Sequence, residues 1–166
     1  MANHHFSKEL LANKDERAIF RLVRAISLSQ GQFSLILVSC NCPSRRQVLI
    51  HHLQEVSSIP IQELIVPSSS NTLFTTILRV VEVSMPQALM VYGLEAVVEI
   101  DHVISATNLV RDEFRKQFPF PLIIWINSEI LQKLIRLAPD FKDWDLNPIR
   151  FEVPKNQFFE LAAFSA

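Results

Sequence analysis

The chain has 166 residues, a natural size for one domain with a sizeable hydrophobic core. Hydrophobic residues make up 49% and charged residues 20%, and the formal net charge is -1, so bulk electrostatics give no case for a nucleic acid or a membrane surface as a partner. No apolar run approaches the roughly 18 residues needed to span a bilayer, and the N-terminus lacks the apolar region and cleavage site of a signal peptide. With only two cysteines, these features predict a reduced, cytoplasmic protein.

Helical and strand patterns alternate along the chain. Apolar residues at helical spacing predict a first helix over 15–29, with Gly31 as its stop. Near-continuous apolar runs predict five strands, at 33–38, 61–66, 88–92, 122–126 and 149–153, with the first strand central. Further helices are expected from about 44 to 57 with Ser44 as cap, after a cap at Asn71, from about 98 to 118, and from Asn127 or Ser128 to Pro139. Strands covered by helices on both faces predict an α/β fold, a three-layer α/β/α sandwich around a mostly parallel five-stranded sheet.

The same patterns divide the chain into three parts. Residues 1–14 are expected to form a flexible N-terminal arm and residues 15–153 the α/β domain. Residues 154–166 are expected to be a C-terminal tail or the start of a linker. Because this tail carries three phenylalanines, we expect it to pack on its own domain or on a neighbouring copy if it is not a linker.

The stretch 33–55 is a buried strand, a polar turn and a helix, the opening unit of an open α/β sheet. Ligands of such sheets bind beside the carboxyl ends of the strands, where this turn lies. A phosphate-binding protein carries G-x-x-x-x-G-K-[ST] at this place. Laid over that frame, Ser39 and Ser44 replace the glycines, Arg45 and Arg46 follow, and Pro43 removes one amide donor. The helix N-terminus still favours anions, so the stretch is either an anion or nucleotide site or a solvated loop.

Three segments resemble one protein family. They are the block 118–144, which contains PFPLIIWINSEILQKLIRLAPDFKDW, and the runs ISLSQGQFSLILVSCN and ALMVYGLEAV. The resemblance is to STAND-class signal-transduction NTPases, in particular the N-terminal domains of large cyanobacterial proteins that continue into tetratricopeptide or propeller repeats. It covers roughly residues 15–153, and it implies a P-loop NTPase-like fold with strand order 5-1-4-3-2. It implies nucleotide binding only where the motif residues are present.

The motif residues depart from those of the active members. In those members a lysine neutralises the terminal phosphates and a Ser or Thr hydroxyl binds Mg²⁺. Here Arg45 stands at the lysine position and Arg46 at the hydroxyl position. A guanidinium pairs well with phosphate, but it cannot ligate magnesium. The resemblance therefore implies degenerate nucleotide motifs in this chain.

Two further polar residues follow strand ends. Active members hold the Mg²⁺ shell with an Asp at the tip of the third strand, where this chain has Gly93 and Leu94, so Glu95 is the nearest carboxylate. Glu95 either acts on a water or is a first-turn helix acid, and we favour the second. Asn127 ends the fourth strand, where the resembling fold has a polar sensor for the terminal phosphate; a helix cap is the alternative that we favour.

Cys40, Cys42, His51 and His52 are residue types that bind zinc. A C-x-C spacing is unusual for zinc, and adjacent histidines on a helix point about 100° apart. We therefore predict no metal site.

These observations lead to one leading hypothesis and two alternatives. We predict a non-catalytic signalling or scaffold module that mediates protein interaction or self-association, without a cofactor. One alternative is a divergent ATPase or GTPase domain that binds ATP or GTP with Mg²⁺ through Arg45 and Glu95 in altered roles, and the other is a structural oligomerisation domain. No residue is predicted to be catalytic, and Glu95 is the nearest candidate.

Overall fold

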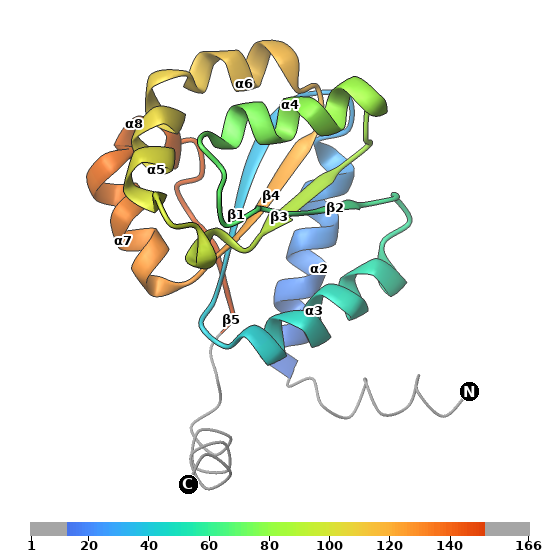
Figure 1. Cartoon of the computed structure of the whole chain (residues 1–166). Coiled ribbons are helices and arrows are strands. Elements are labelled where there is room, and N and C mark those ends of the chain that lie inside the picture. The colour runs from blue at the N-terminus through green and yellow to red at the C-terminus, as the bar shows by residue number, and fades with distance from the viewer. Residues whose placement is uncertain (1–12, 152–166) are drawn as a thin grey trace, which may run out of the picture.

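The computed structural model describes residues 13–151, and it has the α/β architecture that the alternating patterns predict. All strand pairs of its five-stranded sheet are parallel, in the order β2-β3-β4-β1-β5 (Figure 1). The strands are β1 (Ser34–Cys40), β2 (Gln62–Ile65), β3 (Leu89–Tyr92), β4 (Pro121–Ile126) and β5 (Ile149–Phe151). This is the strand order that the family resemblance implied. β1, the strand predicted to be central, lies in the interior of the sheet between β4 and β5, and β4 is the middle strand of the five.

Helices cover both faces of the sheet and complete a three-layer sandwich (Figure 1). One face is covered by α2 (Asn13–Leu28) and α3 (Pro43–Val56). The opposite face is covered by α4 (Leu73–Val83), α5 (Ile100–Leu109), α6 (Arg111–Gln117), α7 (Ser128–Leu137) and α8 (Pro139–Lys142), and a short 3-10 helix, η1 (Leu94–Ala96), follows β3. No helix in the described part of the chain is long and apolar enough to cross a membrane.

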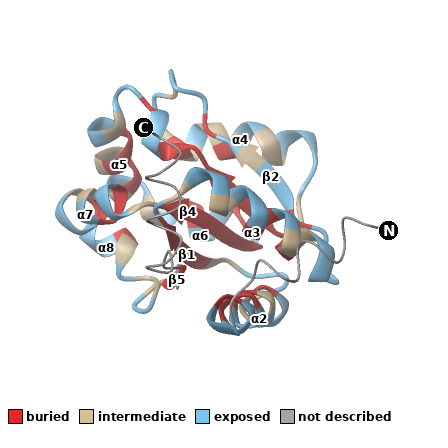
Figure 2. Cartoon of the chain, turned by 90° about the horizontal axis from the view of Figure 1, so that it is seen from below, coloured by how far each residue is buried: buried red, intermediate tan, exposed pale blue. Residues whose placement is uncertain are grey.

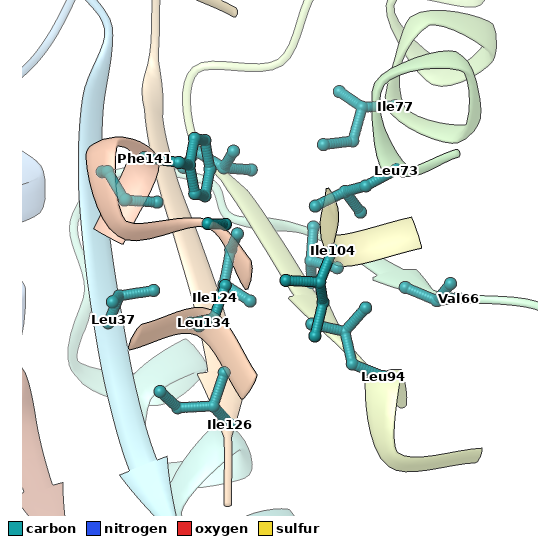
Figure 3. Close-up of a cluster of buried hydrophobic side chains, with 14 of the residues drawn as sticks. Leu37, Val66, Leu73, Ile77, Leu94, Ile104, Ile124, Ile126, Leu134 and Phe141 are labelled. Atoms are coloured by element: carbon teal, nitrogen blue, oxygen red, sulfur yellow. The ribbon is translucent and has the colours of Figure 1, made fainter. Parts of the chain in front are cut away.

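The core on the α4–α8 face is apolar and rich in aromatic rings. Aliphatic side chains from the sheet and the covering helices point toward one another there, among them Leu37, Ile124 and Ile104 (Figure 3). Phe114 is fully buried, and its ring centroid lies 5.1 Å from that of Phe141 and 5.5 Å from that of Phe118. The Phe114–Phe118 pair is edge-to-face, an arrangement that adds to the free energy gained by burying the rings.

The expected long helix over 98–118 is in fact broken in two at Val110. Val110 has φ -107° and ψ 16°, outside the helical region, and its side chain is 36% exposed rather than buried. The break is stabilised from outside the helix, because the Asn108 side chain accepts a hydrogen bond from the Phe141 N–H at 3.1 Å. After the break, α6 turns Phe114 into the core.

Two of the predicted helix caps were also wrong by one or two residues. Helix α3 begins at Pro43 with Cys42 as its N-cap, not at Ser44, and α4 is capped by Thr72, whose hydroxyl accepts from the Thr75 N–H at 3.1 Å, not by Asn71. Proline is preorganised for the first helical position, which explains the earlier start of α3.

The predicted N-terminal arm and C-terminal tail lie largely outside residues 13–151. The predicted tail 154–166, the last two residues of the predicted fifth strand and residues 1–12 of the predicted arm lie outside the described residues. Asn13 and Lys14, the other two residues of that arm, begin α2.

Candidate functional site

The predicted phosphate frame lies at the carboxyl edge of the sheet, but its residues do not form a loop. Strand β1 continues through Ser39, which is 9% exposed, to Cys40, and α3 begins at Pro43. Only Asn41 and Cys42 connect the two elements. A backbone that wraps a phosphate needs several consecutive free amides and glycine flexibility, and a two-residue connection offers neither.

Arg45 is held by an acid from another helix. Its guanidinium donates a hydrogen bond to Asp15 of α2, and the side chains are only 11% and 5% exposed. Asp15 lies on the buried stripe of α2, among Ala18, Ile19 and Leu22. The sequence analysis did not single out Asp15, although an acid in phase with an apolar helical stripe is a signal of a buried ion pair.

Arg46 is held by Glu95, so two predicted site residues do meet. Arg46 Nη1 lies 2.6 Å from Glu95 Oε1, and its guanidinium lies 5.2 Å from the centre of the Tyr92 ring. Glu95 is in the first turn of η1, as predicted, and its carboxylate faces a guanidinium rather than an open space. Gly93, at the tip of β3, has φ +95°, a conformation that side chains other than glycine's rarely adopt.

Tyr92 extends this cluster toward the edge strand. Its hydroxyl lies 3.5 Å from Glu63 Oε1 on β2. Burial, and then the nearby Glu63 carboxylate, raise the pKa of Tyr92, so the phenol stays protonated and can donate to Glu63. The sequence analysis missed Tyr92, which appears in the sequence as the last residue of an apolar run.

Asn127 is a helix cap, as favoured. Its Oδ1 accepts a hydrogen bond from the Ile130 N–H at 2.8 Å at the start of α7. A second asparagine, Asn41, links the two neighbouring connections: its Oδ1 accepts from the Ser128 N–H at 2.8 Å and lies 3.0 Å from the Ser128 hydroxyl. These bonds fix the carboxyl end of β1 to the beginning of α7.

The two cysteines lie in different environments. The Ser44 hydroxyl, 3.2 Å from Cys42 Sγ, and then the Arg45 backbone amide, lower the pKa of the Cys42 thiol. Burial raises the pKa of the Cys40 thiol, which lies 3.5 Å from the Cys42 carbonyl oxygen. Among residues 13–151, no group of three or more His, Cys, Asp or Glu side chains is placed to hold a metal ion.

Comparison with models of known protein families and with curated proteins finds no match for this chain. The fold and the polar contacts at the carboxyl edge therefore carry the functional argument.

Proposed function

We propose that this chain is a non-catalytic interaction module, a cytoplasmic signalling or scaffold domain built on a degenerate STAND-type, P-loop NTPase-like fold. One observation carries the proposal: the two arginines at the phosphate-contact positions form ion pairs within the domain. Arg45 pairs with Asp15 and Arg46 with Glu95. A nucleotide would have to displace both carboxylates before either guanidinium met a phosphate.

The shape of the connection supports the same proposal. A Mg²⁺-nucleotide needs a hydroxyl from the loop and a carboxylate at a strand tip. In this chain Arg46 stands at the position of the hydroxyl, and Gly93 and Leu94 stand at the position of the carboxylate. Glu95 is the nearest carboxylate, and it is engaged by Arg46.

The alternative function, a divergent ATPase or GTPase, would also use the carboxyl edge of the sheet. The N-terminus of α3 faces it with the exposed Ser44, and helix N-termini favour anions. Attraction of this kind acts equally on the ground state and the transition state, so it supports binding but not turnover.

Phosphate release separates the two functions. The assay compares the wild type with Arg45→Ala and Glu95→Gln, using ATP and GTP with Mg²⁺, and takes Arg79→Ala, an exposed arginine on α4, as the matched control. We expect background rates for every protein. Turnover above background that Arg45→Ala or Glu95→Gln abolishes, and that Arg79→Ala leaves intact, would replace this proposal with the rival.

A further inference from the structure

The outward face of α2 gathers three arginines and two large apolar side chains. Arg17, Arg21 and Arg24 are exposed, and so are Phe20, at 67%, and Leu28, at 69%. At about 100° per residue these five positions fall within an arc of about 100°, opposite the buried stripe of the helix. Figure 2 shows the buried residues of α2 turned toward the sheet and the exposed ones turned away from it. We name these five residues the α2 arginine face.

These arginines differ from the two at the carboxyl edge. Arg45 and Arg46 are paired with carboxylates, whereas Arg17, Arg21 and Arg24 make no ion pair or hydrogen bond within residues 13–151. The only acid exposed on α2 is Glu16, which lies outside the arc. The face therefore presents three arginines and one neighbouring acid of the same helix, Glu16, which borders a hollow together with Arg17 and Arg21.

A hollow of about 370 Å³ lies beside this face. Arg21, Arg24 and Leu28 border it, and Ile36 of β1 and Ile149 of β5 are among the apolar side chains that line it. Asp145 lines it too, and its carboxylate accepts hydrogen bonds from the backbone N–H groups of Leu37 and Asn147. The hollow exists because β5 pairs only with the last residues of β1, from Val38 onward, which leaves the first half of β1 with β4 as its one neighbouring strand. Its size suits one or two apolar side chains of a partner.

We propose that the α2 arginine face binds an acidic amphipathic helix of another protein. Carboxylates of that helix pair with Arg17, Arg21 and Arg24, and one of its apolar side chains enters the hollow. The proposal rests on the proposed function as an interaction module and names its partner chemistry. The arginines are spaced by four and three residues, about 6 and 4.5 Å along the axis, which matches acids at i, i+4 and i+7 of a helix lying alongside.

Charge and area argue against other occupants. A second copy that presented the same face would bring its arginines against these, which is repulsive. An anionic membrane is disfavoured because Phe20 and Leu28 are eight residues, or about 12 Å, apart, and two separated side chains insert little apolar surface. The net charge of the whole chain, -1, also gives no long-range attraction to a membrane or a nucleic acid.

The test uses the full chain and a synthetic helical peptide of about 20 residues with Glu and Leu on one face, since shorter helices are marginal in water. Its twin carries Gln in place of every Glu. Binding is measured by fluorescence anisotropy for the wild type, for Arg17→Ala/Arg21→Ala/Arg24→Ala, and for Arg79→Ala/Lys116→Ala/Arg136→Ala, which removes the same charge from exposed positions on other helices. Alanine suits exposed helical positions, so both variants are expected to fold.

We expect the wild type to bind the Glu peptide and not the Gln peptide, and its affinity for the Glu peptide to fall as the salt concentration rises. The α2 variant should bind at least about tenfold more weakly and the control within about twofold of the wild type, because three surface ion pairs each contribute modestly. Leu28→Gln, at the rim of the hollow, should weaken binding about threefold.

Several results would overturn the inference. The first is that the Glu peptide does not bind at about 1 mM, a concentration that detects even weak interactions. The second is that the two triple variants lose the same affinity for the peptide. The third is that the wild type binds anionic lipid vesicles but not the peptide, and that the α2 variant no longer binds the vesicles. Nucleotide turnover together with arginine-dependent peptide binding would contradict the proposed non-catalytic function but support the α2 arginine face as a binding surface. Turnover at background level without peptide binding would contradict the α2 arginine face as the binding surface but leave the proposed non-catalytic function standing.

Discussion

The two faces of the sheet are built differently. Among the described residues, the α4–α8 face buries two polar side chains. They are Thr107, whose hydroxyl bonds to the Val103 carbonyl of its own helix, and Ser39, which shares a face of β1 with Leu35 and Leu37. The α2–α3 face buries the Asp15–Arg45 ion pair and, in the same apolar cluster, Cys40 and the stacked rings of Trp125 and Phe151. Among the described residues, the α4–α8 face therefore buries hydroxyls but no charge, whereas the α2–α3 face buries a charged pair.

The charges of the carboxyl edge link separate elements of the domain. An arginine beside the start of α3 would be free to meet a phosphate if no acid lay opposite it. Here α2 supplies Asp15 and η1 supplies Glu95. The charges at the edge thus join separate elements of the domain, which is the physical basis of the non-catalytic proposal.

The largest effect is expected on the α4–α8 face. Phe114→Ala removes a fully buried ring that contacts Phe33, Phe74, Phe118 and Phe141. We expect the free energy of unfolding, measured by urea denaturation, to fall by about 3–5 kcal/mol, because the change leaves a cavity among packed rings. Phe20→Ala, at an exposed position of α2, is the control and should change it by less than about 0.5 kcal/mol. Similar losses for the two variants would contradict the assignment of Phe114 to the core.

A smaller but still large effect is expected at the buried ion pair. Asp15→Ala removes the carboxylate that pairs with Arg45, and we expect a loss of about 3 kcal/mol in the free energy of unfolding. The double variant Asp15→Leu/Arg45→Met replaces both charges with apolar side chains, and it should recover most of that loss. If the double variant has a lower free energy of unfolding than Asp15→Ala, the ion pair makes a net contribution to stability, which would contradict this expectation.

The expectations from the sequence were most accurate where burial alone decides the structure. Apolar runs located β1, β3 and β4 most plainly, because strands covered on both faces have few polar positions, whereas the edge strands β2 and β5 carry exposed residues. The helix expected over 98–118 is broken at Val110, close to where the Asn108 side chain accepts from the Phe141 N–H, a contact between segments 33 residues apart. The spacing of apolar residues within 98–118 contains no information about a contact with a residue outside that segment.

Residues of the carboxyl edge could be identified from the sequence, but their pairing could not. Arg45, Arg46 and Glu95 were all identified as residues of the carboxyl edge. Their pairing required knowing that α2 places Asp15 beside α3 and that the turn after β3 places Glu95 beside Arg46. Spacing along the chain does not encode those distances, whereas the cap at Asn127 is local and was predicted correctly.

Thiol reactivity distinguishes the two cysteines of the α2–α3 side. The pKa of Cys42 is lowered, so its thiolate forms at lower pH than in the unfolded chain, while the pKa of buried Cys40 is raised and its thiolate forms only at higher pH. Alkylation by iodoacetamide at neutral pH should therefore modify Cys42 at least about tenfold faster than Cys40, as followed by peptide mass spectrometry.

Ser44→Ala tests the cause of this difference. Loss of the hydroxyl beside Cys42 Sγ should move the pH midpoint of Cys42 alkylation upward and slow the reaction at neutral pH. Equal rates for the two cysteines, or an unchanged midpoint in Ser44→Ala, would contradict the described environment of the N-terminus of α3.

We propose that the ion pairs of Arg45 and Arg46 leave no nucleotide site at the carboxyl edge. The most direct measurement is the urea denaturation midpoint of the wild type over a series of ATP and GTP concentrations with Mg²⁺, because a ligand at 1,000 times its Kd stabilises a folded protein by about 4 kcal/mol. We predict a midpoint that does not move with nucleotide concentration. A midpoint that rises with nucleotide in the wild type, and stays constant in Arg45→Ala and Arg46→Ala but not in Arg79→Ala, would contradict the claim.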